Sequence, residues 1–212
     1  MKILAPFLAA FCAAAAFAAP AQAHPHVWVT VTSQVIYDSK GEATGIRQAW
    51  KFDDMYSTFA LEGLEQKTKG VYTREELAPL AQVNMTSLKD SDYFTFAKMG
   101  GKDMEFADPA DYWLDYKDEM LTLNFTLPFK TPQQTKNLSV EVYDPSYFVD
   151  FGFDEKDAIK LVGAPAQCKA TIQKPKQGGL GVGQQYMSDA EAMAMMDNLG
   201  QNFASKIAVT CP

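Results

Sequence analysis

A succession of short runs with alternating apolar residues constrains the fold of this chain more than any other feature. The longest run, 27–37 (VWVTVTSQVIY), is rich in β-branched residues and has an apolar side chain at nearly every second position, which predicts a strand with one buried face. A turn sequence, DSKG, follows it, and 45–52 (GIRQAWKF) can return antiparallel to form a hairpin. Similar runs, separated by Gly, Asp and Pro, lie at 93–98, 102–106, 112–116, 120–127, 138–143, 147–153, 158–161 and 207–211. Their spacing is typical of an antiparallel sheet or sandwich.

Three further segments have helical rather than strand patterns. Two of them, 54–66 and 74–89, form a predicted helical hairpin, and the second begins with the capping-box pattern TREE. A third helix is predicted over 188–204, after a glycine-rich linker at about 174–187. We therefore expect an α+β fold. It consists of a mostly antiparallel β sheet or sandwich with a helical hairpin insertion and a C-terminal helix, in a single domain from 24 to 212.

The segment 1–23 has the composition of a secretory signal peptide. Lys2 supplies the positive start, 3–19 is apolar, and 21–23 (AQA) has the small-x-small pattern of a cleavage site. The apolar run is short and rich in alanine, which disfavours a membrane span. We therefore expect export to the periplasm and a mature chain that starts at His24.

The charge balance excludes some classes of partner. Acidic residues outnumber basic ones by 26 to 19, and the formal net charge is −7. Such a balance argues against nucleic acid and anionic membrane surfaces as partners. No membrane insertion is expected after signal cleavage, because no later segment has the length and apolarity of a span.

Cys168 and Cys211 are the cysteines that remain after cleavage, because Cys12 lies within the signal. An even pair of cysteines in an oxidising compartment predicts one disulfide. This bond would join the closing strand to the segment 166–172.

The two histidines of the chain, His24 and His26, stand two residues apart at the predicted mature terminus. After cleavage, the α-amine and imidazole of His24 can chelate a divalent ion, and His26 can add a third nitrogen. Nitrogen donors of this kind suit Zn(II), Ni(II), Co(II) and Cu(II). The square-planar amino-terminal copper–nickel motif is excluded, because Pro25 has no backbone N–H to lose. The alternative is a polar, mobile terminus that binds no metal.

Carboxylates, amides or water must supply any remaining ligands, because there is no third histidine. The candidate carboxylates are Asp53, which follows a predicted strand, and Asp144 and Asp150, which lie in the segment YDPSYFVDF. Asp144 precedes a proline and also has the pattern of a turn former. Asp150 interrupts an apolar run, so it needs a partner if it is buried, and an ion or Arg47 could serve.

A calcium site is not expected in the loop 65–76 (EQKTKGVYTREE), although its outline is that of an EF-hand. Gly70 and Glu76 occupy the sixth and twelfth loop positions, but Lys67 and Lys69 stand where calcium needs oxygen ligands. The chain has no GxSxG motif and no cysteine in catalytic surroundings, so we assign no catalytic residue.

Several motifs recur together in one bacterial family: HPHVWV, WKFDDMYS, VYDPSYFVDF, APAQC and a terminal VTCP. Over nearly the whole mature chain, the sequence resembles domain of unknown function family 1007. That family is described as the periplasmic component of an uncharacterised ABC-type transport system. The resemblance implies an association with membrane permeases of the nickel/cobalt type and, for some members, with zinc acquisition. It also implies that His24 and His26 match the HPH of the family.

We therefore expect a non-enzymatic periplasmic protein that binds or delivers a transition metal. Its expected partner is an inner-membrane metal permease or another component of an ABC-type transporter. One alternative is a metal-free interaction module that docks on a transporter through its sheet. The other is a copper oxidase with a histidine brace, although such braces usually take their second imidazole from a distant strand.

Overall fold

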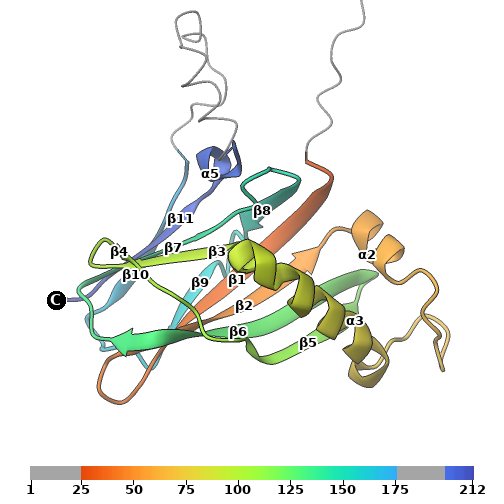
Figure 1. Ribbon diagram of the computed structural model, residues 1–212, viewed down its shortest axis with the longest axis horizontal. Coiled ribbons are helices and arrows are strands. Elements are labelled where there is room, and N and C mark those ends of the chain that lie inside the picture. The colour runs from red at the N-terminus through yellow and green to blue at the C-terminus, as the bar shows by residue number, and fades with distance from the viewer. Residues whose placement is uncertain (1–24, 176–198) are drawn as a thin grey trace, which may run out of the picture.

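The computed structural model describes residues 25–175 and 199–212, and Figure 1 shows its two β-sheets and the helices around them. The predicted signal, His24 and residues 176–198 lie outside the described residues. The strands are β1 Val27–Tyr37, β2 Ala43–Phe52, β3 Thr95–Met99, β4 Lys102–Asp103, β5 Ala110–Lys117, β6 Met120–Gln133, β7 Asn137–Val142, β8 Val149–Phe153, β9 Ile159–Val162, β10 Lys169–Gln173 and β11 Lys206–Thr210. The helices are α2 Asp54–Ala60, α3 Arg74–Leu88, the 3-10 helix η1 Lys89–Phe94, and α5 Leu199–Phe203.

The first sheet is built around β1 and has the strand order β5-β6-β2-β1-β8, with β9 also pairing with β1. The predicted hairpin of β1 and β2 is confirmed, with Val35 opposite Ile46. Strands β8 and β9 run parallel to β1, so the antiparallel prediction fails at this edge of the sheet. The side chains of β1 alternate between buried and more exposed positions over its whole length, as its sequence predicts.

The second sheet has the order β10-β11-β7-β3-β4 and is antiparallel throughout. It packs on the first sheet through an apolar cluster that includes Val35 and Ile46 from one sheet and Val140 and Ile207 from the other. The predicted α+β sandwich is therefore confirmed. Helix α3 lies across the other part of the first sheet and buries Leu77, Ala81 and Met85 there.

A line of buried polar side chains crosses the interior between the two sheets. Ser33 Oγ donates to Gln48 Oε1 at 2.6 Å, and Gln48 Nε2 donates to Thr95 Oγ1 at 3.4 Å. All three side chains are at most 1 % exposed. Because each polar atom in this line has a partner, the line favours one register of β1, β2 and β3 over its neighbours.

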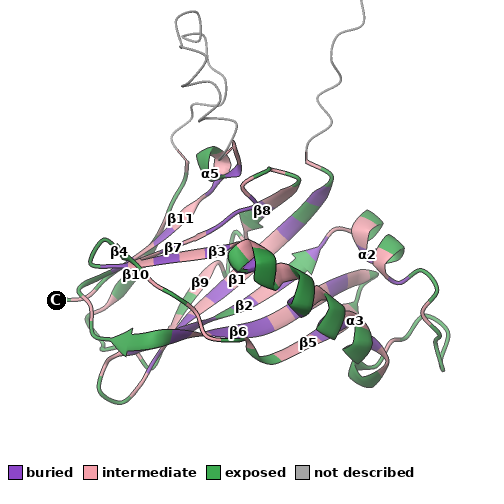
Figure 2. Cartoon of the chain, viewed as in Figure 1, coloured by how far each residue is buried: buried purple, intermediate pink, exposed green. Residues whose placement is uncertain are grey.

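The capping box of α3 is confirmed. Thr73 accepts a hydrogen bond from the Glu76 backbone, and the Glu76 side chain accepts one from the Thr73 backbone. The first helix of the hairpin is shorter than predicted and ends at Ala60 instead of continuing to 66. Gly63, three residues later, has a φ of +81°, which is incompatible with a continuing right-handed helix. Figure 2 shows that the outward faces of both helices are exposed.

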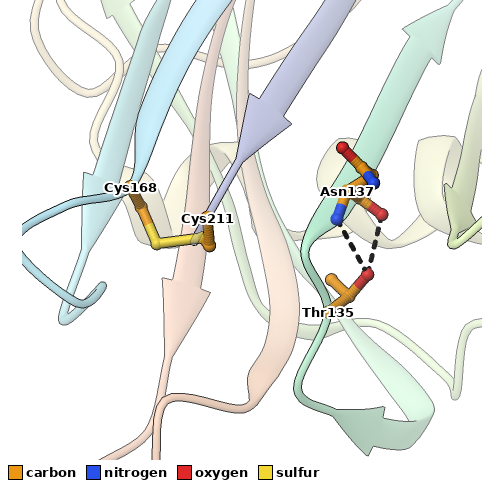
Figure 3. The surroundings of a disulfide bond; sticks show 4 residues. All are labelled: Thr135, Asn137, Cys168 and Cys211. Atoms are coloured by element: carbon orange, nitrogen blue, oxygen red, sulfur yellow. Dashed lines mark hydrogen bonds between the residues drawn. A yellow bond between two sulfur atoms is a disulfide. The ribbon is translucent and has the colours of Figure 1, made fainter.

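The predicted disulfide between Cys168 and Cys211 is present, with an S–S distance of 2.01 Å (Figure 3). It joins the start of β10 to the residue after β11. Nearby, Asn137 at the start of β7 donates its backbone N–H to Thr135 Oγ1, at 3.2 Å. None of the helices in the described part of the chain is long and apolar enough to cross a membrane.

Candidate functional site at the start of strand β1

His26 stands directly before β1 and is held against the loop that leads into β8. Its backbone N–H donates to the carbonyl oxygen of Phe148 at 2.9 Å. Its ring lies 4.8 Å from the Phe148 ring, measured between centroids. The His26 side chain remains exposed. The second predicted histidine ligand, His24, lies outside the described residues, two positions earlier in the chain.

Parallel pairing of β1 with β8 places Trp28 beside Asp150. Val27 and Val29 point into the core, so the alternation of a strand directs Trp28, and His26 before it, to the opposite face. Trp28 is 47 % exposed on that face. The structure therefore brings Asp150 beside Trp28, two residues after His26, although His26 and Asp150 are 124 positions apart in the sequence.

Asp150 is the candidate carboxylate that is partly buried and not hydrogen-bonded by the described residues. Burial raises the pKa of Asp150 above its ordinary value, because the charged form loses solvation. In the described part of the chain, its carboxylate makes no hydrogen bond or ion pair. Arg47 does not fill this role, because it pairs with Gln34 along β1 and donates from Nε to Thr126 Oγ1 at 3.4 Å.

Asp144 has the turn role that its proline neighbour indicates. One carboxylate oxygen accepts from the Ser146 backbone N–H at 2.9 Å, and the other accepts from the Val149 backbone N–H at 3.1 Å. The Ser146 hydroxyl donates to the same carboxylate at 2.8 Å. With the residue only 6 % exposed, these bonds occupy the carboxylate and fix the start of β8.

Asp53 is likewise occupied by backbone groups. Its Oδ1 caps α2 by accepting from Tyr56 N–H at 2.8 Å, and its Oδ2 accepts from Trp28 N–H at 2.8 Å. The Asp53 backbone N–H in turn donates to the Trp28 carbonyl at 3.0 Å. Asp53 therefore fixes the start of β1 to helix α2, just as Asp144 fixes the start of β8.

The loop before β8 is also held from its other side by α5. Gly200 donates its backbone N–H to the Pro145 carbonyl at 3.2 Å, and a Cβ atom at position 200 would lie 1.8 Å from the Asp144 carbonyl oxygen. Only glycine allows such an approach. Two residues further on in the loop, Tyr147 stacks on Phe203, with ring centroids 4.6 Å apart. The loop before β8 and helix α5, which precedes β11, therefore both support the structure around His26 and Asp150.

Two ligands do not complete a metal site. Within 25–175 and 199–212, no three His, Cys, Asp or Glu side chains come close enough together to hold a metal ion. The described residues therefore contribute one histidine and one carboxylate that is not used elsewhere. Any complete site of the predicted kind depends on His24.

Sequence reasoning missed the aromatic residues around this site. Phe148, which contacts His26, and Trp28, which lies beside Asp150, were read only as strand residues. Both are large apolar side chains that are nearly half exposed, at 46 % and 47 %. Their positions depend on the parallel pairing of two distant strands, and no local pattern in the sequence reports that pairing.

The EF-hand-like loop closes through its own side chains. Glu76 accepts hydrogen bonds from the backbone N–H groups of Thr73, at 2.8 Å, and Lys67, at 3.1 Å. These bonds lower the pKa of Glu76. Gly70 has a φ of +78° and donates its N–H to Gln66 Oε1 at 2.7 Å. The Glu76 carboxylate, at the twelfth loop position, thus caps helix α3 and also binds the backbone at the start of the loop.

Comparison with known proteins gives relatives whose descriptions assign no activity. The chain is 23 % identical over 193 residues to an "Uncharacterized protein" of Haemophilus influenzae, and the match covers 89 % of this chain and 91 % of that relative. It is 28 % identical over 93 residues to the "Uncharacterized 15.5 kDa protein in trpE 3'region" of Spirochaeta aurantia, which covers 43 % of this chain and 66 % of the relative. A family match extends over residues 9–211, and the chain belongs to the family described as "Protein of unknown function (DUF1007)".

Proposed function

We propose that this protein binds a divalent transition-metal ion at the start of β1, through His24, His26 and Asp150. The observation that carries the proposal is the pairing of β1 with β8, which places Asp150 beside Trp28, two residues after His26, while the Asp150 carboxylate makes no hydrogen bond or ion pair among the described residues. A half-buried carboxylate without a partner is costly, and a bound cation would offset that cost. Imidazole and carboxylate together suit Zn(II), Ni(II), Co(II) or Cu(II).

His24 is within reach of this site by chain length alone. Two residues of extended chain span at most about 7 Å, so the His24 side chain and α-amine stay close to His26. In a mature chain that begins at His24, the amine and the imidazole can bind the ion as a chelate. The proposed ligand set is therefore the amine and imidazole of His24, the imidazole of His26 and the carboxylate of Asp150.

The surroundings of the proposed site are suited to holding its ligands in place. Asp53 and Asp144 fix the two strand ends through hydrogen bonds, and Phe148 packs on the His26 ring. Supporting contacts of this kind orient metal ligands and raise affinity. In this proposal Asp53 and Asp144, which the sequence offered as ligands, position the ligands instead.

We further propose that the protein acts in the periplasm as an accessory of a membrane metal permease or ABC-type transporter. The disulfide fits an oxidising compartment. The signal-like sequence at 1–23 and the resemblance of the motifs to a family associated with metal permeases support the same role. Binding and delivery, rather than catalysis, fit a site whose ligands come from an exposed strand end.

The test is a metal titration of protein that begins at His24, compared with His24→Ala, His26→Ala and Asp150→Asn. Asp111→Asn is the matched control, because Asp111 is exposed on β5, at the opposite edge of the sheet from β8. We expect each of the three site variants to weaken binding of Zn(II), Ni(II), Co(II) or Cu(II) by at least about tenfold, and the control to leave it unchanged. Identical affinities in all five proteins for every metal would rule out the proposal.

A further inference from the structure

A cavity of about 610 Å³ lies beside the Phe148 loop, between η1 and the segment that leads into β8. Three phenylalanines, Phe94, Phe96 and Phe148, supply much of its wall, and Asp90 and Asp92 also line it. Among the residues that the structure describes, no lysine or arginine lines the cavity. It therefore combines aromatic faces with negatively charged carboxylates.

The aromatic walls are held by neighbouring rings. Phe96 stacks on Tyr143 with centroids 4.3 Å apart, and Phe94 packs against Phe151 at 5.6 Å. Phe148 is 46 % exposed, so it presents apolar surface beside the carboxylates. Rings fixed in this way offer a preorganised surface to a planar group.

The two carboxylates at the cavity are available to a ligand. Within the described chain, neither Asp90 nor Asp92 makes a side-chain hydrogen bond or an ion pair. The neighbouring cation, Lys89, is engaged elsewhere, because its Nζ lies 2.7 Å from Asp108 Oδ1. Asp144 also lines the cavity, but its oxygens are occupied by Ser146 and Val149.

We propose that this cavity binds an arginine side chain of a partner polypeptide. A guanidinium group is planar, stacks on aromatic rings and forms paired hydrogen bonds with carboxylates, whereas a lysine ammonium is a compact, strongly hydrated charge. The cavity is larger than one guanidinium group, and its apolar residues Pro145 and Val149 offer contacts for the side chains that flank the arginine. A polypeptide can contact both the aromatic rings and carboxylates and the apolar residues Pro145 and Val149, whereas free arginine can contact only the first group.

The backbone at the cavity allows a clean test of charge. Asp92, Tyr93 and Phe94 have φ values of 49°, 52° and 45°, in the left-handed region. Asparagine adopts this region as readily as aspartate does, so Asp92→Asn removes the charge without new strain. Asp118 is a matched control, because it is exposed, has a φ of 52° and does not line the cavity.

The experiment is an NMR titration of the isotope-labelled protein with a capped peptide that has one arginine between two leucines. The same peptide with citrulline or lysine in place of arginine, and free arginine, are the comparison probes. A metal chelator is present throughout, so the result does not depend on the proposed metal site. We expect the backbone amides of 91–96 and 146–149 to shift with the arginine peptide. Removal of the charge, as citrulline or as the double variant Asp90→Asn/Asp92→Asn, weakens binding at least about fivefold.

Binding that is equal for arginine and citrulline, or unchanged in the double variant, overturns the proposal. Lysine binding as tight as arginine overturns the choice of a guanidinium group, and free arginine binding as tight as the peptide overturns the choice of a polypeptide. A loss of binding in Asp118→Asn as large as in the double variant contradicts the assignment to this cavity. Affinity that falls as salt rises from about 0.05 to about 0.3 M supports the charge contribution.

Discussion

The two ends of β1 are built differently, although they belong to one strand. At the Tyr37 end, the Asp38 carboxylate accepts hydrogen bonds from the backbone N–H groups of Lys40 and Glu42, each at 2.9 Å. Gly41 completes this turn with a φ of +76°. A Cβ atom on Gly41 would lie 3.3 Å from the Pro165 ring, three residues before the disulfide at Cys168. The polar groups of this turn are used to close it.

The other end, at Val27, has a carboxylate that makes no hydrogen bond or ion pair within the described chain. Asp53 and Asp144 fix the strands there, as Asp38 fixes the turn at the opposite end. Asp150, however, has no hydrogen bond or ion pair among the described residues, and it lies beside Trp28, two residues after the exposed His26. A carboxylate at either end of β1 is therefore free to act as a ligand only where no backbone N–H already binds it, whatever its residue type.

Loss of the disulfide near the Tyr37 end of β1 should have the largest effect on stability. We expect the double variant Cys168→Ser/Cys211→Ser to lower the free energy of unfolding by about 2–4 kcal/mol, because the unfolded chain regains the entropy of an open loop. Urea denaturation under oxidising conditions measures the change. Metal affinity should stay within about twofold of the parent protein if the two ends are independent. A parallel loss of metal affinity would contradict that independence.

At the Val27 end of β1, replacement of Asp144 should destabilise the protein more than any other single change. Asp144→Asn substitutes an amide nitrogen for one of two buried acceptors and leaves a backbone N–H without its partner. We expect the free energy of unfolding to fall by about 1–3 kcal/mol. Chemical denaturation gives the value, and Asp157→Asn, at an exposed position in the loop before β9, serves as the control. An unchanged stability would show that Asp144 does not hold the loop.

Replacement of Asp53 should have a slightly smaller effect. Asp53→Ala removes the cap of α2 and the acceptor for Trp28 N–H, and loss of a helix cap costs about 0.5–2 kcal/mol. Thermal unfolding monitored by circular dichroism measures the loss. Asp53→Asn, which retains one cap acceptor, should recover part of it. If both variants are as stable as the parent, the link between α2 and β1 is unimportant.

Replacement of Asp150 should raise the free energy of unfolding instead of lowering it, and this change should be the smallest of the four. Burial raises the pKa of Asp150, so between its ordinary pKa and the raised value the folded state binds more protons than the unfolded state. Its contribution to stability therefore falls as pH rises through that window and is lowest above the raised pKa. We expect Asp150→Asn to increase the free energy of unfolding at pH 7, by less than about 1 kcal/mol, and to have no such benefit near pH 3.

The measurement for Asp150 is urea denaturation of both proteins, without metal, at several pH values. A destabilisation at pH 7 would show that the carboxylate has a stabilising partner, and a stabilisation that is the same at all pH values would show that the buried charge is not its cause. Metal affinity should depend on pH in the opposite way to the contribution of Asp150 to stability. It should fall as pH drops through the raised pKa, because a protonated carboxylate cannot bind the ion.

The sequence predicted most of the fold, because local periodicity reports local structure. The alternation in 27–37 gave β1 with its observed bounds, and TREE gave the start of α3. The predicted strand at 93–98 begins only at Thr95, because Asp92, Tyr93 and Phe94 form a turn with positive φ values. The parallel direction of β8 was missed, since strand pairing over a long sequence separation leaves no local pattern.

The candidate site was predicted in part, and the missing part has a physical reason. Residue type and clustering indicated His26, and the interruption of an apolar run indicated Asp150, which the fold places beside Trp28. The same reasoning also kept Asp53 and Asp144 as candidate ligands, although the proline after Asp144 indicated a turn. A sequence does not show which backbone N–H groups face a carboxylate in the folded chain, and those N–H groups decide the roles of these two residues.

The most direct test of the proposed metal site changes only the amino terminus. Zn(II) affinity is measured for the chain that begins at His24 and for the same chain with one glycine before His24, which converts the chelating amine into an amide. We predict that the added glycine weakens Zn(II) binding at least about tenfold and leaves the free energy of unfolding without metal unchanged. Equal Zn(II) affinity in the two proteins would contradict a metal site that uses the amino terminus of His24, next to the Val27 end of β1.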